Sequence, residues 1–289
     1  MTILDGKKIS EEILSDLKRE IKAKRLKLTL AVIQVGGDSV SRVFVEQKKK
    51  ACEKIGVNLE LFKFPAKIKN SEFKKEIKKI ITDPVNSGVI IQLPVPKKFQ
   101  PEEEFTNLIP EEKDVDVLSE KGFMKFFRGT SPILPPVVGG IDFLLKKYGI
   151  KLRGKNVVIM GAGKLTGMPS AIWALQKEGT VSVVTASTQK PSYFTEKADI
   201  LISGAGKPGL IKGNMVKKEV VVVDCGTNLP RSVLLKAGLL RGKIGKKMKG
   251  DVDFKTVARK ASYITPVPGG MGPMTVAMVL WNLIKMNKK

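Results

Sequence analysis

The stretch 157–178, VVIMGAGKLTGMPSAIWALQKE, decides how the second half of this chain folds. Its first four residues are an apolar run that predicts a buried strand, and its second half predicts a helix. Between them stand Gly161, Gly163 and Gly167. A strand that ends in spaced glycines and opens a helix is the arrangement that binds a dinucleotide pyrophosphate: the first glycine turns sharply, the second admits the phosphates, and the third packs helix on strand. The alternative is an ordinary glycine turn after a strand.

The pattern extends outward from this stretch on both sides. Apolar runs that predict strands alternate with amphipathic stretches that predict helices, an order typical of α/β folds with a largely parallel sheet. In the second half, further strands are predicted at 181–185, 200–203, 220–223 and 263–264. In the first half, strands are predicted at 28–35, 57–64 and 88–93, and helices from the N-cap Ser10, at 39–55, 72–82 and 101–106, followed by a polar loop at 109–117.

The proline-rich segment 132–138 is typical of a domain junction. We expect a first domain at 1–138 and a second, dinucleotide-binding domain of the Rossmann-like type at 139–272, beginning with a connecting helix at 140–148. The apolar helix predicted at 273–286, within the C-terminal segment 273–289, is expected to pack back on the first domain.

Charge is the most unusual feature of the composition. The 289 residues include 52 Lys and Arg against 28 Asp and Glu, a formal net charge of +24. Such a balance favours an anionic partner. Lysines form local clusters at 48–50 and 243–249 but are otherwise scattered, and aromatic residues, which stack on bases, are 6%. High intracellular salt or an anionic small-molecule substrate would explain the charge as well as nucleic acid does, and nucleic acid is the less favoured partner.

Several classes of protein are disfavoured. The chain has no histidine, which removes Ser-His-Asp and Cys-His catalysis and histidine metal sites. Cys52 and Cys225 are too few for a disulfide framework and indicate free thiols in a reducing compartment. We find no secretion signal and no apolar stretch long enough for a membrane span. We therefore expect a cytoplasmic protein without a metal site.

Lys48 is the first candidate for chemistry. On a helix over 39–55, it shares the apolar face predicted for Val40, Val43, Phe44, Gln47, Ala51 and Ile55. One interpretation is a lysine that extends its ammonium into water. The other is a lysine held at the edge of a cleft, where burial and the neighbouring lysines lower its pKa toward the range useful for acid–base catalysis.

Other polar residues stand where open α/β sheets bind ligands. Gln92 ends the apolar strand at 88–93, and its amide either bonds to backbone or faces a ligand. Asp114 and Asp116 form either a solvated turn or a pair of acceptors for an amino-heterocycle. The run Gly269–Gly272 is either a hinge or backbone that approaches a flat ligand.

In order along the chain, the following motifs occur: Ser41-x-x-Phe44-x-x-x-Lys48-x-x-Ala51-Cys52, Gln92-Leu-Pro-x-Pro96, Lys113-Asp-Val-Asp116, the glycine turn at 161–167, Gly206-Lys-Pro-Gly209, and Ile264-Thr-Pro-Val-Pro-Gly-Gly-x-Gly-Pro-Met-Thr275. Together they resemble the bifunctional methylenetetrahydrofolate dehydrogenase/methenyltetrahydrofolate cyclohydrolase family. The resemblance covers nearly the whole chain.

The resemblance implies two reactions: a hydride passes from 5,10-methylenetetrahydrofolate to a nicotinamide cofactor, and water then opens the methenyl product to 10-formyltetrahydrofolate. It implies catalytic roles for Lys48, which handles protons, for Gln92, which orients the lysine, and for Asp116, which also binds the pterin. It implies a homodimer and NADP, with NAD as the alternative. The further residues implied for folate are Phe44, Pro268, Gly269 and Gly270, and those for the cofactor are Gly161, Ala162, Gly163, Lys164, Gly167, Ser187, Gly206 and Thr227.

The chain departs from the family pattern at informative positions. Phe44 stands where the family has tyrosine, so a hydroxyl near the lysine is missing, and an enzyme with only one of the two activities is an alternative. Ala162, Gly163 and Ala186 replace residues that usually seat the 2′-phosphate of NADP. Val117 stands where glycine is usual. A third alternative is a basic RNA-binding protein built on a degenerate enzyme scaffold.

Overall fold

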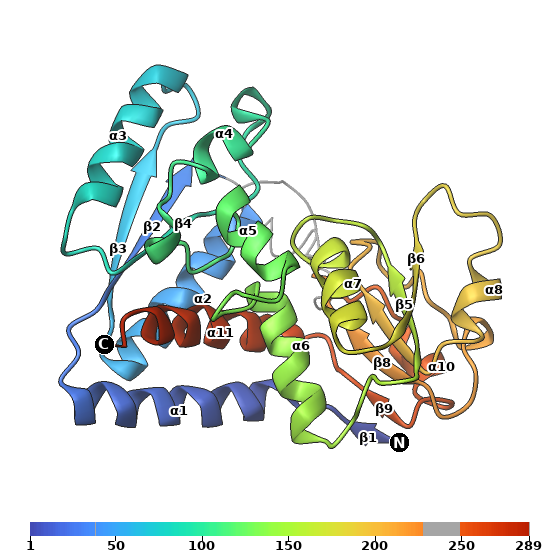
Figure 1. Cartoon of the computed structure of the whole chain (residues 1–289). Coiled ribbons are helices and arrows are strands. Elements are labelled where there is room, and N and C mark those ends of the chain that lie inside the picture. The colour runs from blue at the N-terminus through green and yellow to red at the C-terminus, as the bar shows by residue number, and fades with distance from the viewer. Residues whose placement is uncertain (38, 228–248, 289) are drawn as a thin grey trace, which may run out of the picture. The chain divides into compact units, whose positions relative to one another are not determined.

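The computed structural model describes residues 1–37, 39–227 and 249–288. It divides the chain into two compact units (Figure 1). We call residues 11–136 and 276–289 the small-sheet unit, and residues 1–10 and 137–275 the large-sheet unit. The chain is therefore an α/β protein of two parts, as the sequence predicts. The lysine run at 243–248 lies outside the described residues.

The small-sheet unit is built on three parallel strands in the order β3-β2-β4. On β2, Ala31, Ile33 and Val35 pack with Phe73 and Ile77 of α3 in one buried cluster. The intervening residues of β2 therefore face the opposite side of the sheet. The strands are β2 (Thr29–Val35), β3 (Asn58–Phe64) and β4 (Gly88–Ile91), and the helices are α2 (Ser39–Ile55), α3 (Asn70–Thr82), η1 (Lys97–Phe99), α4 (Glu103–Thr106), η2 (Glu111–Lys113) and α5 (Glu120–Phe127).

The C-terminal helix α11 (Met271–Met286) packs back on this unit. The side chain of Asn282 donates hydrogen bonds to the carbonyls of Val115 and Leu134, each at 2.9 Å. A Cβ added to Gly88 on β4 would lie 2.6 Å from a methyl of Leu283, so only glycine fits beneath the helix. The predicted polar loop at 109–117 is wrong in character, because Ile109, Asp114, Val115 and Val117 are buried.

The large-sheet unit carries six strands, all parallel, in the order β1-β9-β8-β7-β5-β6. Most of its strand residues are buried, as expected for a parallel sheet covered on both faces. The strands are β1 (Thr2–Ile3), β5 (Asn156–Met160), β6 (Thr180–Val184), β7 (Ile200–Ser203), β8 (Val221–Asp224) and β9 (Tyr263–Ile264), and the helices are α6 (Pro136–Lys147), α7 (Gly167–Gln176), α8 (Ser192–Thr195), η3 (Gly213–Met215) and α10 (Phe254–Val257).

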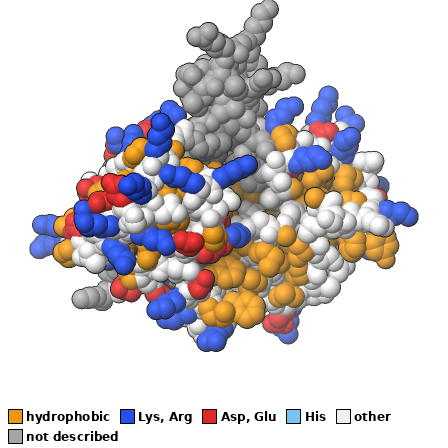
Figure 2. Space-filling model, turned by 90° about the horizontal axis from the view of Figure 1, so that it is seen from above, with side chains coloured by type: hydrophobic (Ala, Val, Ile, Leu, Met, Phe, Trp, Pro, Cys, Tyr) orange, Lys and Arg blue, Asp and Glu red, His pale blue; other side chains and the backbone are white. Residues whose placement is uncertain are grey.

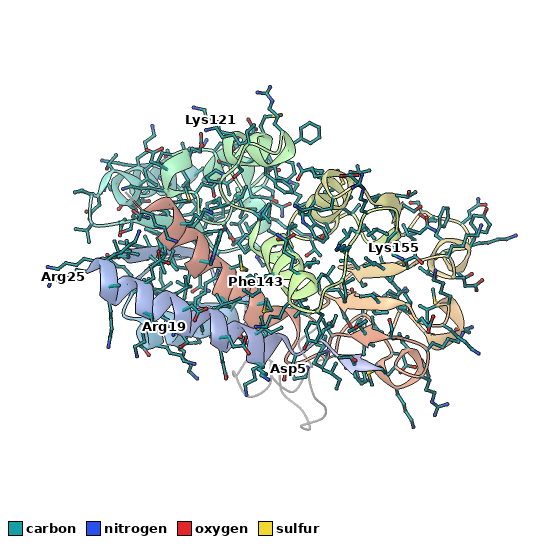
Figure 3. The ribbon with its side chains drawn as sticks, turned by 60° about the horizontal axis from the view of Figure 1, so that its bottom comes forward. Asp5, Arg19, Arg25, Lys121, Phe143 and Lys155 are labelled. Carbon is teal, nitrogen blue, oxygen red and sulfur yellow. The ribbon has the colours of Figure 1, made fainter. Side chains whose placement is uncertain are left out.

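The first residues of the chain correct two expectations. Because β1 pairs with β9, residues 1–10 lie in the large-sheet unit rather than with the rest of 1–138. Helix α1 (Gly6–Lys24) begins four residues before the predicted N-cap Ser10. Its cap is Asp5, whose carboxylate accepts a hydrogen bond from the backbone N–H of Lys8 at 2.9 Å (Figure 3). Ser10 bonds instead to the carbonyl of Lys7 inside the helix.

Basic side chains do not gather into one patch on the face drawn in Figure 2, where acidic side chains lie among them. Several exposed lysines and arginines pair with acids, such as Arg19 with Asp16 on α1. In Figure 3, Arg25, the residue after α1, extends away from the end of that helix.

Candidate functional site

Lys48 lies inside the small-sheet unit and not in water. Only 6% of it is exposed, and its Nζ donates a hydrogen bond to Oε1 of Gln92 at 2.9 Å. The interpretation in which the lysine extends into solvent is therefore wrong. The buried face of α2 also differs from the predicted one: Gln47 is exposed, Val43 and Phe44 are half-buried, and the side chain of Val40 lies outside the described residues. The inward residues are Ser41, Val45, Lys48, Ala51, Cys52 and Ile55.

Gln92 holds the lysine in a defined orientation. Its backbone N–H continues the sheet ladder by donating to the carbonyl of Ile33 at 2.8 Å. Its side-chain Nε2 donates to the carbonyl of Leu93 at 2.8 Å, and the hydroxyl of Ser41 donates to the same carbonyl at 3.3 Å. With Nε2 engaged by backbone, Oε1 must face Lys48. The interpretation in which the amide bonds to backbone therefore holds for Nε2, and Oε1 bonds to Lys48.

Burial and charge oppose one another at Lys48. Desolvation lowers the pKa of the Lys48 ammonium from its ordinary value, and nearby Asp116 acts to raise it. Desolvation likewise raises the pKa of Asp116, which is half-buried, while Lys48 acts to lower it. Burial raises the pKa of Cys52 to about 12, so this thiol stays protonated at neutral pH. Burial thus moves the pKa of the Lys48 ammonium toward neutral pH, which suits this group to proton exchange.

Asp116 stands on a turn that Asp114 organises. Asp114 is 2% exposed, which excludes the solvated turn, and its carboxylate accepts hydrogen bonds from the backbone N–H groups of Leu118 and Ser119 at 3.2 and 2.8 Å. Val117 adopts a φ of 56°. This left-handed backbone is costly for a β-branched residue and explains why glycine suits the position. The two aspartates thus differ: one shapes the turn and the other is presented beside Lys48.

The glycine turn of the large-sheet unit has the geometry that its spacing predicts. Gly161 follows β5 with a φ of 97°, and a Cβ there would lie 2.8 Å from the carbonyl oxygen of Gly204. A Cβ on Gly167, where α7 begins, would overlap the carbonyl oxygen of Gly161. Gly163 has open space where its Cβ would stand. The first and third glycines serve the turn and the packing, and the second leaves room for a ligand beside the helix N-terminus.

The remaining candidates for the cofactor follow neighbouring strands. The ladder pairs Met160 with Val184 and with Ser203, and Ser203 with Asp224, so the carboxyl ends of β6, β5, β7 and β8 lie in register. Ala162, Lys164 and Ser187 are exposed there, as is Gly206, which has a φ of 66°, and Thr227 is half-buried. This edge of a parallel sheet is where such folds bind ligands.

Pro268, Gly269 and Gly270 follow β9 and belong to the large-sheet unit, whereas Phe44 and Asp116 belong to the small-sheet unit. Gly269 has a φ of 106°, and its carbonyl accepts a hydrogen bond from the N–H of Lys7 at 2.8 Å. A Cβ on Gly270 would lie 2.5 Å from the carbonyl oxygen of Pro266. Glycine is thus favoured at 269 by the backbone conformation and required at 270 by packing.

Sequence reasoning missed two buried carboxylates, Asp224 and Asp251, which lie near the carboxyl edge of the large sheet. The available signal was an acid directly after an apolar run, as in Val221–Asp224. Within the described residues, no cluster of His, Cys, Asp or Glu is arranged to hold a metal ion. The same part of the chain contains no helix that is long and apolar enough to span a membrane.

Comparison with known proteins assigns both halves of the chain. Residues 4–116 match the catalytic domain of tetrahydrofolate dehydrogenase/cyclohydrolase, and residues 135–289 match its NAD(P)-binding domain. The chain is 38% identical over 293 residues to the bifunctional protein FolD of Nitratiruptor sp., covering 100% of this chain and 99% of that protein. The FolD of Nautilia profundicola is 40% identical over 293 residues, covering 100% and 98%.

Solved structures agree. The FolD methylenetetrahydrofolate dehydrogenase/cyclohydrolase of Campylobacter jejuni matches with a TM-score of 0.90 at 38% identity, covering 99% of this chain and 98% of that one. The enzyme of Trypanosoma brucei, solved with NADP cofactor and inhibitor, matches with a TM-score of 0.90 at 29% identity, covering 99% and 96%. The chain therefore belongs to the tetrahydrofolate dehydrogenase/cyclohydrolase family.

Proposed function

We propose that this protein oxidises 5,10-methylenetetrahydrofolate to the methenyl form with a nicotinamide cofactor and then hydrolyses the product to 10-formyltetrahydrofolate. Family membership supports both reactions. The observation that carries the hydrolytic step is the buried ammonium of Lys48, held by Gln92 and facing the charge of Asp116. A buried lysine with a lowered pKa suits proton transfer at neutral pH.

In this proposal Lys48 acts as its neutral amine. One N–H donates to Gln92, which leaves the lone pair free to take a proton from the water that attacks the methenyl carbon. A C–O bond forms as that proton moves to Nζ. The proton then passes to the departing ring nitrogen as its bond to the same carbon breaks. The hydroxyl of the intermediate releases its own proton to solvent as the C=O bond forms, which leaves a formyl group. Asp116 is assigned to accept hydrogen bonds from the N–H groups of the pterin.

The glycine turn supports the dinucleotide assignment. We assign the pyrophosphate to the turn 161–167, with Gly163 as the point of closest approach and the N-terminus of α7 as the positive pole. The residues assigned to the rest of the cofactor are Ala162, Lys164, Ser187, Gly206 and Thr227. When bound, the nicotinamide supplies the acceptor for the hydride. The chain's own contribution to that step is positioning.

We assign NADP rather than NAD as the preferred cofactor. Residues 185–190, which follow β6, are Thr-Ala-Ser-Thr-Gln-Lys, so the carboxylate that binds the 2′-hydroxyl of NAD has no counterpart there. Ser187 and Lys190 are exposed and offer a hydroxyl and a cation to a 2′-phosphate. The ratio of kcat/KM for NADP to that for NAD tests the assignment, and Lys190→Ala should lower this ratio. A ratio below one in the unmodified enzyme would refute it.

We propose a homodimer formed through the large-sheet unit. Strand β6 is an edge of the six-stranded sheet, and its Val183 is 39% exposed. On the adjacent helix α7, Met168 and Leu175 are 47% and 60% exposed. An exposed apolar edge strand is a site for pairing with another chain. Light scattering should give twice the mass of the 31.7 kDa chain, and Val183→Lys should shift it toward the monomer.

We place the enzyme in the cytoplasm, because Cys52 and Cys225 are free thiols. Folate, an anionic substrate, accounts for part of the positive charge. The RNA-binding alternative has no specific support, since the basic residues in the described part of the chain are scattered and several pair with acids.

Purified protein supplied with methylenetetrahydrofolate and either cofactor tests the two activities together. Reduced nicotinamide absorbance reports the first step. If only the dehydrogenase works, the methenyl intermediate accumulates; if both work, it is consumed. Methenyltetrahydrofolate supplied alone reports the second step without cofactor. Absence of both activities would refute the proposal, and loss of only one would favour the single-activity alternative.

A further inference from the structure

Two buried carboxylates organise the carboxyl edge of the large sheet. Asp251 is fully buried, and its Oδ2 accepts hydrogen bonds from the hydroxyl of Ser203 at 2.8 Å and from the N–H groups of Ala205 and Gly206 at 2.7 and 3.2 Å. Its Oδ1 accepts from the N–H of Lys207 at 2.8 Å. One side chain therefore satisfies three successive backbone donors of the loop that follows β7.

Asp224 holds Asp251 in turn. Its carboxylate accepts hydrogen bonds from the N–H groups of Gly226, Asp251 and Val252 at 2.8, 3.1 and 2.9 Å. Glycine is needed at two neighbouring positions: a Cβ on Gly226 would lie 2.5 Å from the Asp251 carboxyl, and a Cβ on Gly250 would overlap Oδ2 of Asp224. Every donor named here is an N–H or O–H, so both carboxyl groups serve as acceptors. The two carboxylates can pack this closely against the backbone because residues 226 and 250 are glycines.

The loop held by Asp251 lies directly against the glycine turn. A Cβ on Gly161 would lie 2.8 Å from the carbonyl oxygen of Gly204 and 3.0 Å from the Cα of Ala205. A Cβ on Gly204 would lie 2.5 Å from Cγ2 of Thr166, the residue before α7. The backbone after β7 thus fills the space between the first residue of the turn and the start of the helix. Any shift of this loop would move the turn.

We propose that Asp251, supported by Asp224, is a positioning residue for the nicotinamide dinucleotide: it fixes the loop 204–207, and this loop fixes the pyrophosphate turn. The inference rests on the proposed binding of the cofactor at this edge. Asp251 itself does not touch the cofactor in this account. Its effect passes through the backbone of Gly204 and Ala205.

Charge and position predict opposite results for Asp251→Asn. The change removes a negative charge from the site of an anionic ligand, so electrostatics alone predicts equal or tighter binding. It also replaces an acceptor oxygen with an N–H₂ group that faces backbone donors, which leaves buried groups unpaired and releases the loop. Weaker binding would therefore be a result of lost positioning.

The test uses the full chain and measures NADPH binding by fluorescence titration. We expect Asp251→Asn to raise the Kd about tenfold, equivalent to about 1.4 kcal/mol. Hydrogen exchange of the peptide spanning 204–209 should become faster. Hydrolysis of methenyltetrahydrofolate supplied without cofactor should change less than twofold, because Lys48, Gln92 and Asp116 lie in the other unit. The KM for the cofactor should rise more than that for folate.

Asp199→Asn is the matched control. Asp199 accepts a hydrogen bond from the N–H of Asn156 at 2.8 Å and pairs with Lys217, but it lies before β7, at the opposite edge of the same sheet. Asp199→Asn removes the same negative charge as Asp251→Asn, but the affinity for NADPH should stay within twofold of that of the unmodified protein. Ser203→Ala removes one donor to Asp251, preserves the carboxylate, and should raise the Kd about threefold even if Asp251→Asn fails to fold.

The outcomes separate the two proposals. Unmodified protein that binds neither NADPH nor NADH would overturn the proposed cofactor function. Unmodified protein that binds NADPH, together with folded Asp251→Asn or Ser203→Ala of unchanged or tighter affinity, would overturn the positioning role alone. An equal loss of affinity in Asp199→Asn would also overturn it, because general destabilisation would then explain the effect.

Discussion

The ammonium of Lys48 and the side-chain oxygen of Gln92, 44 positions apart in the sequence, are joined by a buried hydrogen bond of 2.9 Å. The other end of the Gln92 amide bonds to the backbone, so its oxygen is the atom that faces residue 48. A side chain at position 48 that only accepts hydrogen bonds would therefore have no donor there. This bond fixes the position of Lys48, the proposed base of the small-sheet site. Three of the predictions below concern that base.

Lys48→Met should reduce hydrolysis of methenyltetrahydrofolate by at least about 100-fold, because a general base contributes on that order to rate. Methionine retains the length and apolar stem of lysine but has no lone pair suited to the proton. The measurement is the loss of methenyl absorbance without cofactor. Lys49→Met, at the exposed neighbouring position, is the control and should keep full activity. Equal rates in the two variants would remove Lys48 from the mechanism.

Asp116→Asn should move the pH dependence of the hydrolytic reaction to lower pH. Asp116 acts to raise the pKa of Lys48, so its neutralisation lets desolvation lower that pKa further. If the neutral amine is the active form, kcat/KM rises with pH through this pKa, and the rising limb shifts toward acid. The pH at the midpoint of the rising limb is the readout, because the maximum value of kcat/KM also falls when pterin binding weakens.

Glu46→Gln is the control for this shift, because it removes a carboxylate from the exposed side of the same helix. Its limb should coincide with that of the unmodified enzyme. A shift of the Asp116→Asn limb toward higher pH would show that Asp116 does not favour the ammonium form.

Phe44→Tyr should accelerate the hydrolytic step. Phe44 lies one helical turn before Lys48 and is half-buried, so tyrosine at this position would bring a hydroxyl to the vicinity of the base and its water. One hydrogen bond of about 1 kcal/mol corresponds to roughly a fivefold increase in rate. Phe127→Tyr, which adds the same hydroxyl at a position that is 56% exposed, should leave the rate unchanged. A folded Phe44→Tyr protein with no gain would contradict the missing-hydroxyl argument.

Local sequence patterns predicted the helices and strands well, but they did not predict the contacts between distant segments. The bounds of α2 and of β7 agree with the sequence prediction, because each is set by a periodic apolar pattern within a single segment. The start of α1 was misplaced because Asp5 and Ser10 are both good capping residues, and only the distant pairing of β1 with β9 selects between them. The resemblance implied that Gln92 orients Lys48, and the structure contains the hydrogen bond between them.

Polar groups buried by non-local packing left almost no trace in the sequence. Asp251 accepts hydrogen bonds from residues more than 40 positions away, and no sequence pattern near Asp251 predicts those donors. Gln34 is a similar case, because it lies within the apolar run that predicts a strand at 28–35. Its location on β2, one position past the register pair Ile33–Ile91, places it beside Gln92 on the sheet face opposite α3.

Gln34→Leu should stabilise the protein. Gln34 is 4% exposed, and its Nε2 has no hydrogen-bond partner among the described residues. A buried, unpaired amide costs about 1–3 kcal/mol, and leucine of similar volume removes that cost. The free energy of unfolding of the small-sheet unit, measured by urea denaturation followed by hydrogen exchange of β2, should rise by about that amount. Gln47→Leu, an exposed glutamine-to-leucine change on α2, should stay within about 0.5 kcal/mol of the unmodified protein. A decrease for Gln34→Leu would mean that the amide is satisfied by ordered water, since removal of a bonded polar group lowers stability rather than raising it.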